Sequence, residues 1–257
     1  MTKTITLTNQ KGGVAKTTTA LALAAGLSNR GYRVLGVDLD PQSNFALSSG
    51  IETVELEETL FDVFKKNTNA NSVVQKSPLG YDVLPGGLSL AGADMEFVQQ
   101  TGRDYMLKEA LEELDNDYDY VIIDTPPTLG ILTANAMTAS DSIIVPMCAD
   151  LYSLQGLSQL NGLIFNVRKY CNKDLKLAGL LITKYHSNQN ISKAVSDKIA
   201  QIAQELDTKV FTTKIRESVA IREAQLLHSD IFKEAPKANA TLDYAQLIDE
   251  ILAEGAE

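Results

Sequence analysis

The residues from position 10 to position 18 are of types that bind phosphate groups. They lie between an apolar run and a helix-like segment and read Gln10-Lys11-Gly12-Gly13-Val14-Ala15-Lys16-Thr17-Thr18. A glycine-rich turn that leads into a helix directs several backbone N–H groups and the positive end of the helix dipole at one point. Lys16 can reach the β- and γ-phosphates of a nucleotide, and Thr17, the first helical residue, can give its hydroxyl to Mg²⁺. The stretch therefore predicts a site for a nucleotide and its metal ion.

Carboxylates end two of the other apolar runs. Asp38 and Asp40 stand two residues apart at the end of one run, and Asp124 ends another. Residues two apart point to the same side of an extended chain, and doubly wound folds bind ligands at the carboxyl ends of their strands. We therefore expect Asp38 and Asp40 close to the metal and the attacking water, and Asp124 to hold Mg²⁺ as a Walker B carboxylate.

A parallel sheet is needed to bring these residues together. Apolar runs rich in β-branched residues alternate with longer helical patterns, which is typical of βαβ units. We expect an α/β fold with a single doubly wound, mostly parallel sheet flanked by helices, built as one domain over residues 1–257. The predicted strands are Thr4–Thr8, Val34–Val37, Tyr81–Leu84, Tyr120–Ile123, Ser142–Pro146 and Leu177–Thr183. The predicted helices are Thr17–Arg30, Leu154–Tyr170, Ile191–Leu206 and the acidic tail Asp243–Glu257, and Asn67–Ser72 is a predicted loop.

Composition narrows the class of protein. The chain has 257 residues, of which 33 are acidic and 23 basic, and its formal charge is −10. The two cysteines, Cys148 and Cys171, have no second Cys or His at ligand spacing, which argues against a disulfide scaffold or a zinc site. No apolar run is long enough for a secretory signal or a bilayer span, so we expect a cytoplasmic protein. Residues 161–240 are locally basic, with 13 Lys or Arg against 8 Asp or Glu, and one face can therefore contact nucleic-acid phosphates.

The phosphate-binding stretch departs from the usual pattern G-x-x-x-x-G-K-[ST], because Gln10 and Ala15 occupy its glycine positions. The form present, x-K-G-G-x-x-K-[ST], is followed in order by the two carboxylate motifs and by the run Leu132–Asp141. This arrangement resembles the partition ATPases of the ParA type, within the wider group that contains the cell-division ATPase MinD. The resemblance covers nearly the whole chain and implies a P-loop NTPase fold of the deviant Walker A type, with ATP and Mg²⁺ as cofactors.

The resemblance also implies roles for single residues. Asp40 positions or activates the attacking water, while Asp38 supports the water and metal shell. The implied nucleotide contacts are Lys11, Gly12, Gly13, Val14, Ala15, Lys16, Thr17 and Thr18. The implied metal site consists of Thr17, Asp38 and Asp124, and the implied catalytic residues are Lys11, Lys16 and Asp40.

Lys11 is the additional lysine of the motif. In the resembled family this lysine crosses to the nucleotide of a facing subunit, so that two ATP molecules are sandwiched in a homodimer that opens on hydrolysis. The run Leu132–Asp141 helps to build the dimer face in that family. The resemblance further implies slow hydrolysis that a ParB-type centromere-binding protein stimulates, and a role in plasmid or chromosome partition. The chain resembles the short form of the family, without an amino-terminal helix-turn-helix domain.

The DNA surface departs from the family pattern. Ile215-Arg216-Glu217 stands where the family has a Pro-Arg pair, and Ala220 and Asn188 stand where members carry arginines implicated in DNA contact. Phosphate contacts need charge and reach more than a fixed position, so neighbouring basic residues can supply them. The candidates for non-specific DNA binding on the nucleoid are Lys184, Lys193, Lys198, Lys214, Arg216 and Arg222.

Three alternatives share the nucleotide-binding loop. A MinD-like membrane-positioning ATPase needs a basic amphipathic tail, and the acidic tail Asp243–Glu257 argues against membrane binding. A nucleotide-dependent switch or scaffold that hydrolyses little stays open as an alternative because of Ala15, whose Cβ near the phosphates would strain the loop. Nitrogenase-type reductases need cysteines that bridge an iron–sulfur cluster between subunits, and we read Cys148 and Cys171 as structural.

Overall fold

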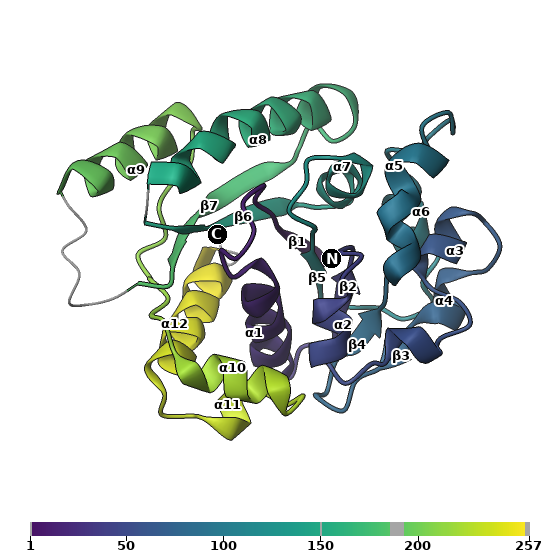
Figure 1. Cartoon of the computed structure of the whole chain (residues 1–257), viewed down its shortest axis with the longest axis horizontal. Coiled ribbons are helices and arrows are strands. Elements are labelled where there is room, and N and C mark those ends of the chain that lie inside the picture. Colours follow the sequence, from purple (N-terminus) through teal and green to yellow (C-terminus); the bar gives the residue numbers. More distant parts are fainter. Residues whose placement is uncertain (1, 150, 186–192, 255–257) are drawn as a thin grey trace.

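The computed structural model describes residues 2–149, 151–185 and 193–254, of which residues 151–155 and 193–197 are described by their backbone alone. Within these ranges a seven-stranded sheet forms the centre of the molecule (Figure 1). Its strand order is β3-β4-β2-β5-β1-β6-β7, and every neighbouring pair is parallel except β3 with β4. The strands are β1 (Lys3–Leu7), β2 (Val34–Asp38), β3 (Gln75–Lys76), β4 (Asp82–Leu84), β5 (Tyr120–Asp124), β6 (Ser142–Cys148) and β7 (Lys176–Thr183).

Helices cover both faces of the sheet (Figure 1). One face packs against α1 (Lys16–Ser28), α2 (Asn44–Ser48), α10 (Val219–Leu226), α11 (Ile231–Glu234) and α12 (Asn239–Glu254). The other packs against α3 (Leu60–Phe64), α4 (Ala70–Val73), α5 (Ala93–Glu96), α6 (Met106–Glu112), α7 (Ile131–Thr138), α8 (Leu151–Tyr170) and α9 (Lys193–Glu205). The short 3₁₀ helices are η1 (Thr53–Glu55) and η2 (Leu88–Gly92). Of the helices in the described ranges, none combines the length and the apolar character needed to cross a bilayer.

Alternate residues of the central strands face different helices. Val34 and Ile122 are buried in the core that includes α1 and α12, whereas Leu35, Val37 and Ile123 are buried in the core that includes α3 and α7. Coverage on both faces explains why these strands are continuous apolar runs in the sequence instead of alternating ones.

The strand and long-helix predictions are confirmed. The predicted strands coincide with β1, β2, β4, β5, β6 and β7, and the predicted helices from Thr17 and Leu154 coincide with α1 and α8. The helix predicted from residue 191 coincides with α9 from Lys193 onward, while residues 186–192 lie outside the described residues. The two residues of β3 carry no periodic signal and were not predictable. The loop prediction for Asn67–Ser72 is wrong from residue 70, where α4 begins, because the Asn69 side chain caps this short helix.

The register of the central strands sets the place of the site. Leu7 of β1 and Asp38 of β2 are both paired with Asp124 of β5. The carboxyl ends of these three strands therefore meet at one edge, which we call the carboxyl edge. The residues predicted to bind a nucleotide and its metal lie at these strand ends and in the segments that directly follow them.

Candidate active site

The loop between β1 and α1 turns sharply at the carboxyl edge. Gly13 and Ala15 have left-handed backbone conformations, with φ angles of 73° and 65°. Glycine adopts this conformation readily, whereas the Cβ of alanine makes it costly. A Cβ at Gly12 or Gly13 would meet nothing within 4 Å, so this part of the loop faces open space. Among the described residues no side chain caps the first turn of α1, which leaves its N–H groups suited to an anion.

Lys16 begins α1, and its side chain is buried with 7% exposed. The Nζ atom donates a hydrogen bond to the carbonyl oxygen of Lys11 at 3.3 Å. Burial lowers the pKa of Lys16 from its ordinary value, and the charges of Asp124 and Asp40 partly oppose this shift. A lysine at the start of a helix that follows a glycine-rich turn is of a type suited to phosphate oxygens.

Thr17 and Asp124 form a direct contact between the first turn of α1 and β5. The Thr17 hydroxyl donates to Asp124 Oδ2 at 2.6 Å. The other carboxylate oxygen, Asp124 Oδ1, is buried and has no hydrogen-bond partner among the residues that the structure describes. Burial raises the pKa of Asp124 well above its ordinary value, and the nearby Asp38 raises it further. A hydroxyl beside an unpartnered carboxylate oxygen fits Mg²⁺, which binds one or two protein oxygens and completes its shell with water and phosphate.

Asp38 ends β2 and is fully buried. Its Oδ1 accepts a hydrogen bond from Asp40 N at 3.0 Å, and its Oδ2 accepts one from Ala46 N at 2.8 Å. Burial raises the pKa of Asp38 to about 7, although these backbone hydrogen bonds oppose the shift. The structure thus places Asp38 beside Asp124, as predicted, but directs both of its oxygens at the backbone of the following turn.

Asp40 lies in that turn, with 9% of its surface exposed. Its Oδ1 accepts a hydrogen bond from Gln42 N at 3.0 Å, and its carbonyl oxygen accepts one from Ser43 N at 2.8 Å. The charge of Asp40 acts on Lys16, which places this carboxylate near the lysine predicted to bind phosphate. The structure therefore brings Lys16, Asp40 and Asp124 together, as the spacing of the motifs predicted.

Asn9 holds the loop in place and was missed by the sequence analysis. Its Oδ1 accepts a hydrogen bond from Lys11 N at 2.9 Å, and its Nδ2 donates to the carbonyl oxygen of Pro146 at 2.8 Å. The carbonyl oxygen of Val14 accepts a further hydrogen bond, from Thr183 Oγ1 at 3.0 Å. The only local signal for Asn9 was an Asn two residues before a loop N–H, which is the spacing of an Asx turn.

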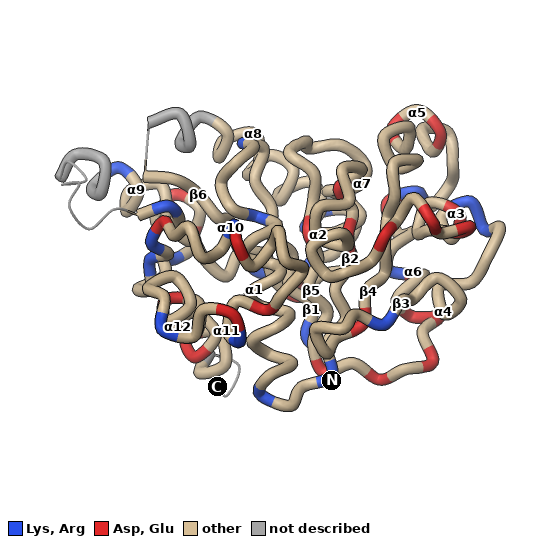
Figure 2. The backbone as a smooth tube through the Cα atoms, turned by 60° about the horizontal axis from the view of Figure 1, so that its bottom comes forward, with Lys and Arg blue, Asp and Glu red and all other residues tan. Residues whose placement is uncertain are grey.

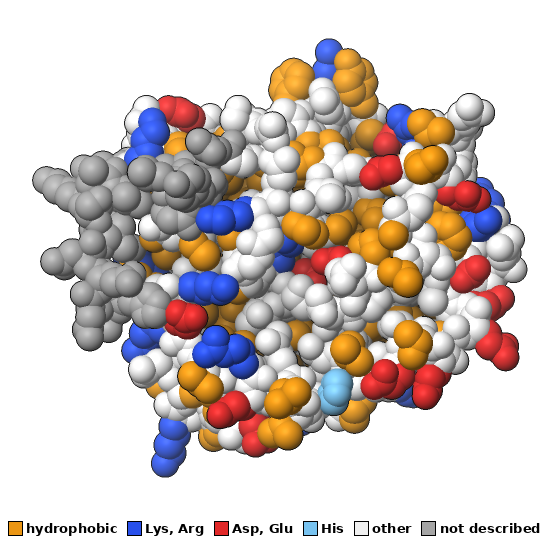
Figure 3. All heavy atoms as spheres, in the orientation of Figure 1, with side chains coloured by type: hydrophobic (Ala, Val, Ile, Leu, Met, Phe, Trp, Pro, Cys, Tyr) orange, Lys and Arg blue, Asp and Glu red, His pale blue; other side chains and the backbone are white. Residues whose placement is uncertain are grey.

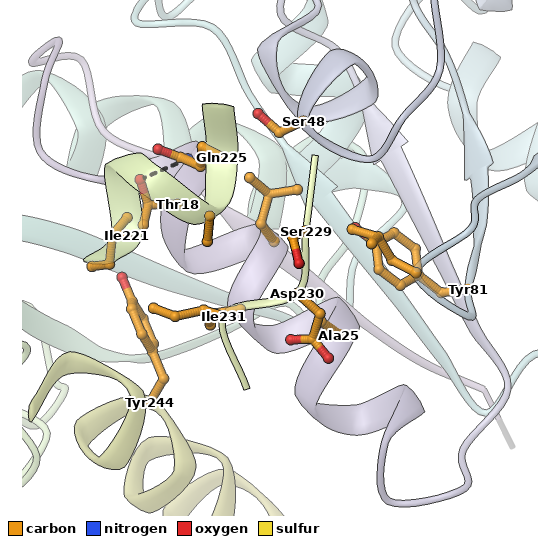
Figure 4. Close-up of a pocket in the computed structure, with 14 residues that line it drawn as sticks. Thr18, Ala25, Ser48, Tyr81, Ile221, Gln225, Ser229, Asp230, Ile231 and Tyr244 are labelled. Carbon is orange, nitrogen blue, oxygen red and sulfur yellow. Dashed lines mark hydrogen bonds between the residues drawn. The ribbon is translucent and has the colours of Figure 1, made fainter. Parts of the chain in front are cut away.

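Helix α10 approaches the loop from the carboxyl-terminal part of the chain. Gln225 Nε2 points toward Thr18 and donates to its hydroxyl at 3.4 Å, as the dashed line in Figure 4 shows. Beneath this contact lies a cavity of about 30 Å³, lined by α1, α2, α10 and α12 and by apolar side chains such as Ile221 and Tyr244. It has room for water but not for a nucleotide base, so we assign it no ligand.

The run Leu132–Asp141 forms α7 and the turn that follows it. Leu132, Ala136 and Met137 are buried in the core, and the Asp94 side chain accepts a hydrogen bond from the backbone N–H of Ile131 at the start of α7. These contacts explain the apolar run by packing, and a role at a dimer face stays a prediction.

Some of the predicted DNA-binding residues gather at the end of β7. Tyr185 forms an isolated parallel bridge with Arg216, and Lys214 Nζ lies 5.2 Å from the centroid of the Tyr185 ring. Lys184 is exposed in a left-handed conformation. Arg216, in contrast, is bound to Asp243, with Nη2 2.6 Å from Oδ1. Arg216 is therefore engaged within the chain.

The remaining candidates lie on α9 and α10. Arg222 and Lys198 are exposed, and Lys198 Nζ donates to Gln201 Oε1 at 3.1 Å. The side chain of Lys193 lies outside the described residues. Lys and Arg residues are frequent along the α9 to α12 side of the backbone (Figure 2). On the face shown in Figure 3, basic side chains gather over α10 and α12 and acidic ones over α3 and α4.

The loop, the buried lysine and the Thr17–Asp124 contact on a doubly wound sheet define a P-loop ATPase, and Lys11 assigns the chain to the deviant Walker A class. A family model described as an AAA domain, AAA_31, matches residues 2–177. The sporulation initiation inhibitor protein Soj of Bacillus subtilis is 38% identical over 256 residues, which are 99% of this chain and 100% of Soj. The chromosome partitioning protein ParA of Myxococcus xanthus is 41% identical over 196 residues, 76% of this chain and 69% of that protein. The chain belongs to the ParA family of partition ATPases.

A solved structure shows the same fold. The crystal structure of cobyrinic acid a,c-diamide synthase from Mycobacterium smegmatis, with bound ADP and magnesium, is similar to this chain with a TM-score of 0.87 and 33% sequence identity. The match covers 100% of this chain and 96% of that one. The predicted fold class is confirmed.

Proposed function

We propose that this protein binds ATP with Mg²⁺ at the β1–α1 loop, forms a nucleotide-sandwich dimer, and hydrolyses ATP to drive the partition of a plasmid or chromosome. The observation that carries the proposal is the convergence of Lys16, Thr17 and Asp124 at the carboxyl edge. The similar M. smegmatis protein was solved with ADP and magnesium, which supports the same cofactors here. The 257 residues act as one ATPase domain.

Within one subunit, each group has a separate task. The loop N–H groups and Lys16 bind the phosphates, and Lys16 exchanges its hydrogen bond with the Lys11 carbonyl for one with a phosphate oxygen. Thr17 and Asp124 hold the metal, which supplies charge neutralisation at the phosphate oxygens when bound. Asp40, fixed in its turn by hydrogen bonds at 3.0 Å and 2.8 Å, orients the attacking water. Charge stabilisation is strong here because the groups around the phosphates are largely buried.

The second subunit completes the site through Lys11. Lys11 lies in the part of the loop next to Gly12 and Gly13, which face open space. A lysine from a facing chain that contacts the γ-phosphate joins two subunits as long as the triphosphate is intact, much as an arginine finger acts in trans. Hydrolysis removes that link, and the dimer opens.

The dimer binds DNA without sequence preference. The exposed residues Lys184, Lys198, Lys214 and Arg222 supply phosphate contacts, Lys193 adds charge, and Arg216 contributes less because Asp243 pairs with it. A ParB-type centromere-binding protein stimulates hydrolysis that is slow in its absence. The protein acts in the cytoplasm on the nucleoid.

The MinD-like alternative is less well supported by the structure. The apolar face of α12 does not lie open for a membrane, because Tyr244, Leu247 and Ile248 are buried against the core that includes α1. The alternative of a switch or scaffold with little hydrolysis rests on the left-handed Ala15, and a rate measurement decides it.

The test measures molar mass by light scattering with ADP, ATP or a slowly hydrolysed analogue, together with phosphate release. Asp40→Ala should bind ATP, accumulate dimer and lose hydrolysis by about 100-fold or more. Lys11→Ala should bind ATP as a monomer, whereas Lys173→Ala, which removes an exposed lysine outside the loop, should behave as the parent.

Three outcomes would contradict the proposal. If Asp40→Ala hydrolysed ATP at the parental rate, Asp40 would not be a catalytic residue. A single species of monomer mass with every nucleotide would remove the dimer. ATP-dependent sedimentation with anionic vesicles, without DNA binding at low salt, would favour the MinD-like alternative.

A further inference from the structure

The turn that carries Asp40 is fastened at both ends by one side chain. Asp38 accepts a hydrogen bond from Asp40 N through Oδ1 and from Ala46 N through Oδ2, at 3.0 Å and 2.8 Å. One carboxylate therefore bridges the first residue of the turn and the first turn of α2. The hydrogen-bonding needs of both backbone donors are met by the same buried carboxyl group.

This bridge also caps helix α2. Ser43 stands at its N-cap position in a left-handed conformation, with φ 53°, and its side chain caps no helix N–H among the described residues. Asp38 replaces that missing cap from the preceding strand, because Ala46 N lies in the first turn of α2.

The main chain around Asp38 and the start of α2 is closely packed. A Cβ at Gly86 would clash with the main-chain oxygen of Asp38, and a Cβ at Gly36 would clash with the ring of Phe45 in α2. Asp38 itself is fully buried. If its carboxylate rotated toward a metal ion, the N–H groups of Asp40 and Ala46 would remain buried without a partner, which is unfavourable.

We propose that Asp38 is a positioning residue that fixes Asp40 for hydrolysis, and that it is not a ligand of the metal shell. The proposal rests on the proposed function, in which Asp40 orients the attacking water. It assigns the metal to Thr17 and Asp124, whose Oδ1 has no other partner among the described residues.

The substitution Asp38→Asn distinguishes a residue that positions Asp40 from a residue that belongs to the metal shell. The amide keeps one acceptor oxygen but presents its NH₂ group to the second backbone N–H, so the turn loosens while the side-chain size is kept. We expect kcat to fall by roughly tenfold to a hundredfold, while the KM for ATP and the Mg²⁺ concentration for half-maximal rate stay within about twofold of the parent. Asp124→Asn should instead raise the Mg²⁺ requirement. Asp62→Asn is the matched control, since Asp62 also caps a short helix but lies on α3.

A second measurement does not depend on hydrolysis. Hydrogen exchange of the nucleotide-free protein, followed by mass spectrometry on peptides that cover residues 36–48, should be faster in Asp38→Asn and unchanged in Asp62→Asn. A raised Mg²⁺ requirement with kcat restored at high Mg²⁺, or unchanged exchange in this segment, would overturn the positioning role. If the parent hydrolyses no ATP, the proposed function fails, and the exchange result still tests the bridge by itself.

Discussion

The carboxyl edge and the side formed by β7, α10 and α12 hold charged residues in opposite ways. At the edge, Lys16, Asp38 and Asp124 are buried, and their hydrogen bonds are with backbone atoms and with the Thr17 hydroxyl. On the other side, Lys214 and Arg222 are exposed, and Lys214 contacts an aromatic ring. Buried charges act at fixed distances in a medium of low polarity, whereas exposed charges are screened by water and salt.

This difference predicts how each region responds to substitution. Removing one buried charge leaves its opposite uncompensated, and the remaining groups cannot rearrange within a packed core. Exposed charges contribute small, nearly independent amounts. A single change should therefore abolish the function of the carboxyl edge, while the basic side should lose its function in steps.

Lys16→Ala should have the largest effect on the edge. The substitution removes the cation placed among Asp40 and Asp124, so that bound phosphates would face these carboxylates with less compensation. We expect ATP affinity to fall by about 100-fold or more, measured by calorimetric titration at fixed Mg²⁺. Lys198→Ala removes the same charge from an exposed position on α9 and should bind ATP as the parent does. An affinity of Lys16→Ala close to the parental value would place the phosphates elsewhere.

The edge could be predicted from the sequence because its signals are local. Strand ends, glycines and carboxylates fall at fixed spacings, and the parallel order of β1, β2 and β5 then brings Thr17 to Asp124. Asp38 marks the limit of this reasoning. Its spacing from Asp40 predicted a place near the metal site, but the sequence pattern does not reveal that α2 folds back and supplies a backbone donor to this carboxylate.

The basic side was harder to predict because its contacts join distant segments. Composition indicated an excess of basic over acidic residues in residues 161–240, but nothing in the sequence shows that Arg216 pairs with Asp243. The contact of Gln225 with Thr18 likewise depends on how α10 packs onto α1. Side-chain pairing between such segments is set by tertiary structure and has no periodic signal.

The basic side should respond in steps. Lys184→Ala, Lys214→Ala and Arg222→Ala should each lower ATP-dependent DNA affinity severalfold, and each should reduce the slope of log affinity against log salt by about 1. Filter binding over a salt series measures both quantities. Lys108→Ala, an exposed lysine on α6, is the matched control. A triple variant with parental affinity and slope would show that DNA contacts another surface.

The smallest expected effect is on how the free energy of unfolding depends on pH. The sign of this dependence differs between the two regions. Burial raises the pKa of Asp38 to about 7, so the folded state retains a proton that the unfolded state releases. The contribution of Asp38 to the free energy of unfolding therefore falls as pH rises from about 4 to 7. Burial would likewise raise the pKa of Glu250, but hydrogen bonds from the N–H groups of Thr212 and Thr213 outweigh it and lower that pKa below its ordinary value of 4.5. Stability from Glu250 is therefore present above pH 4.5 and is lost as pH falls through the lower folded-state value.

The substitution Glu250→Gln tests the direction in which the stability contributed by Glu250 changes with pH. Glu250 accepts hydrogen bonds from Thr212 N at 3.0 Å and Thr213 N at 3.2 Å, and the charged acceptor should stabilise the fold by about 1 kcal/mol at pH 7. Urea unfolding should show that loss in Glu250→Gln at pH 7 and a smaller loss at pH 4, because the stability that the charge contributes diminishes as pH falls below 4.5. Glu57→Gln, an exposed glutamate between η1 and α3, should change neither value. An equal loss at both pH values would mean that the shape of the Glu250 side chain stabilises this region, and that its charge does not.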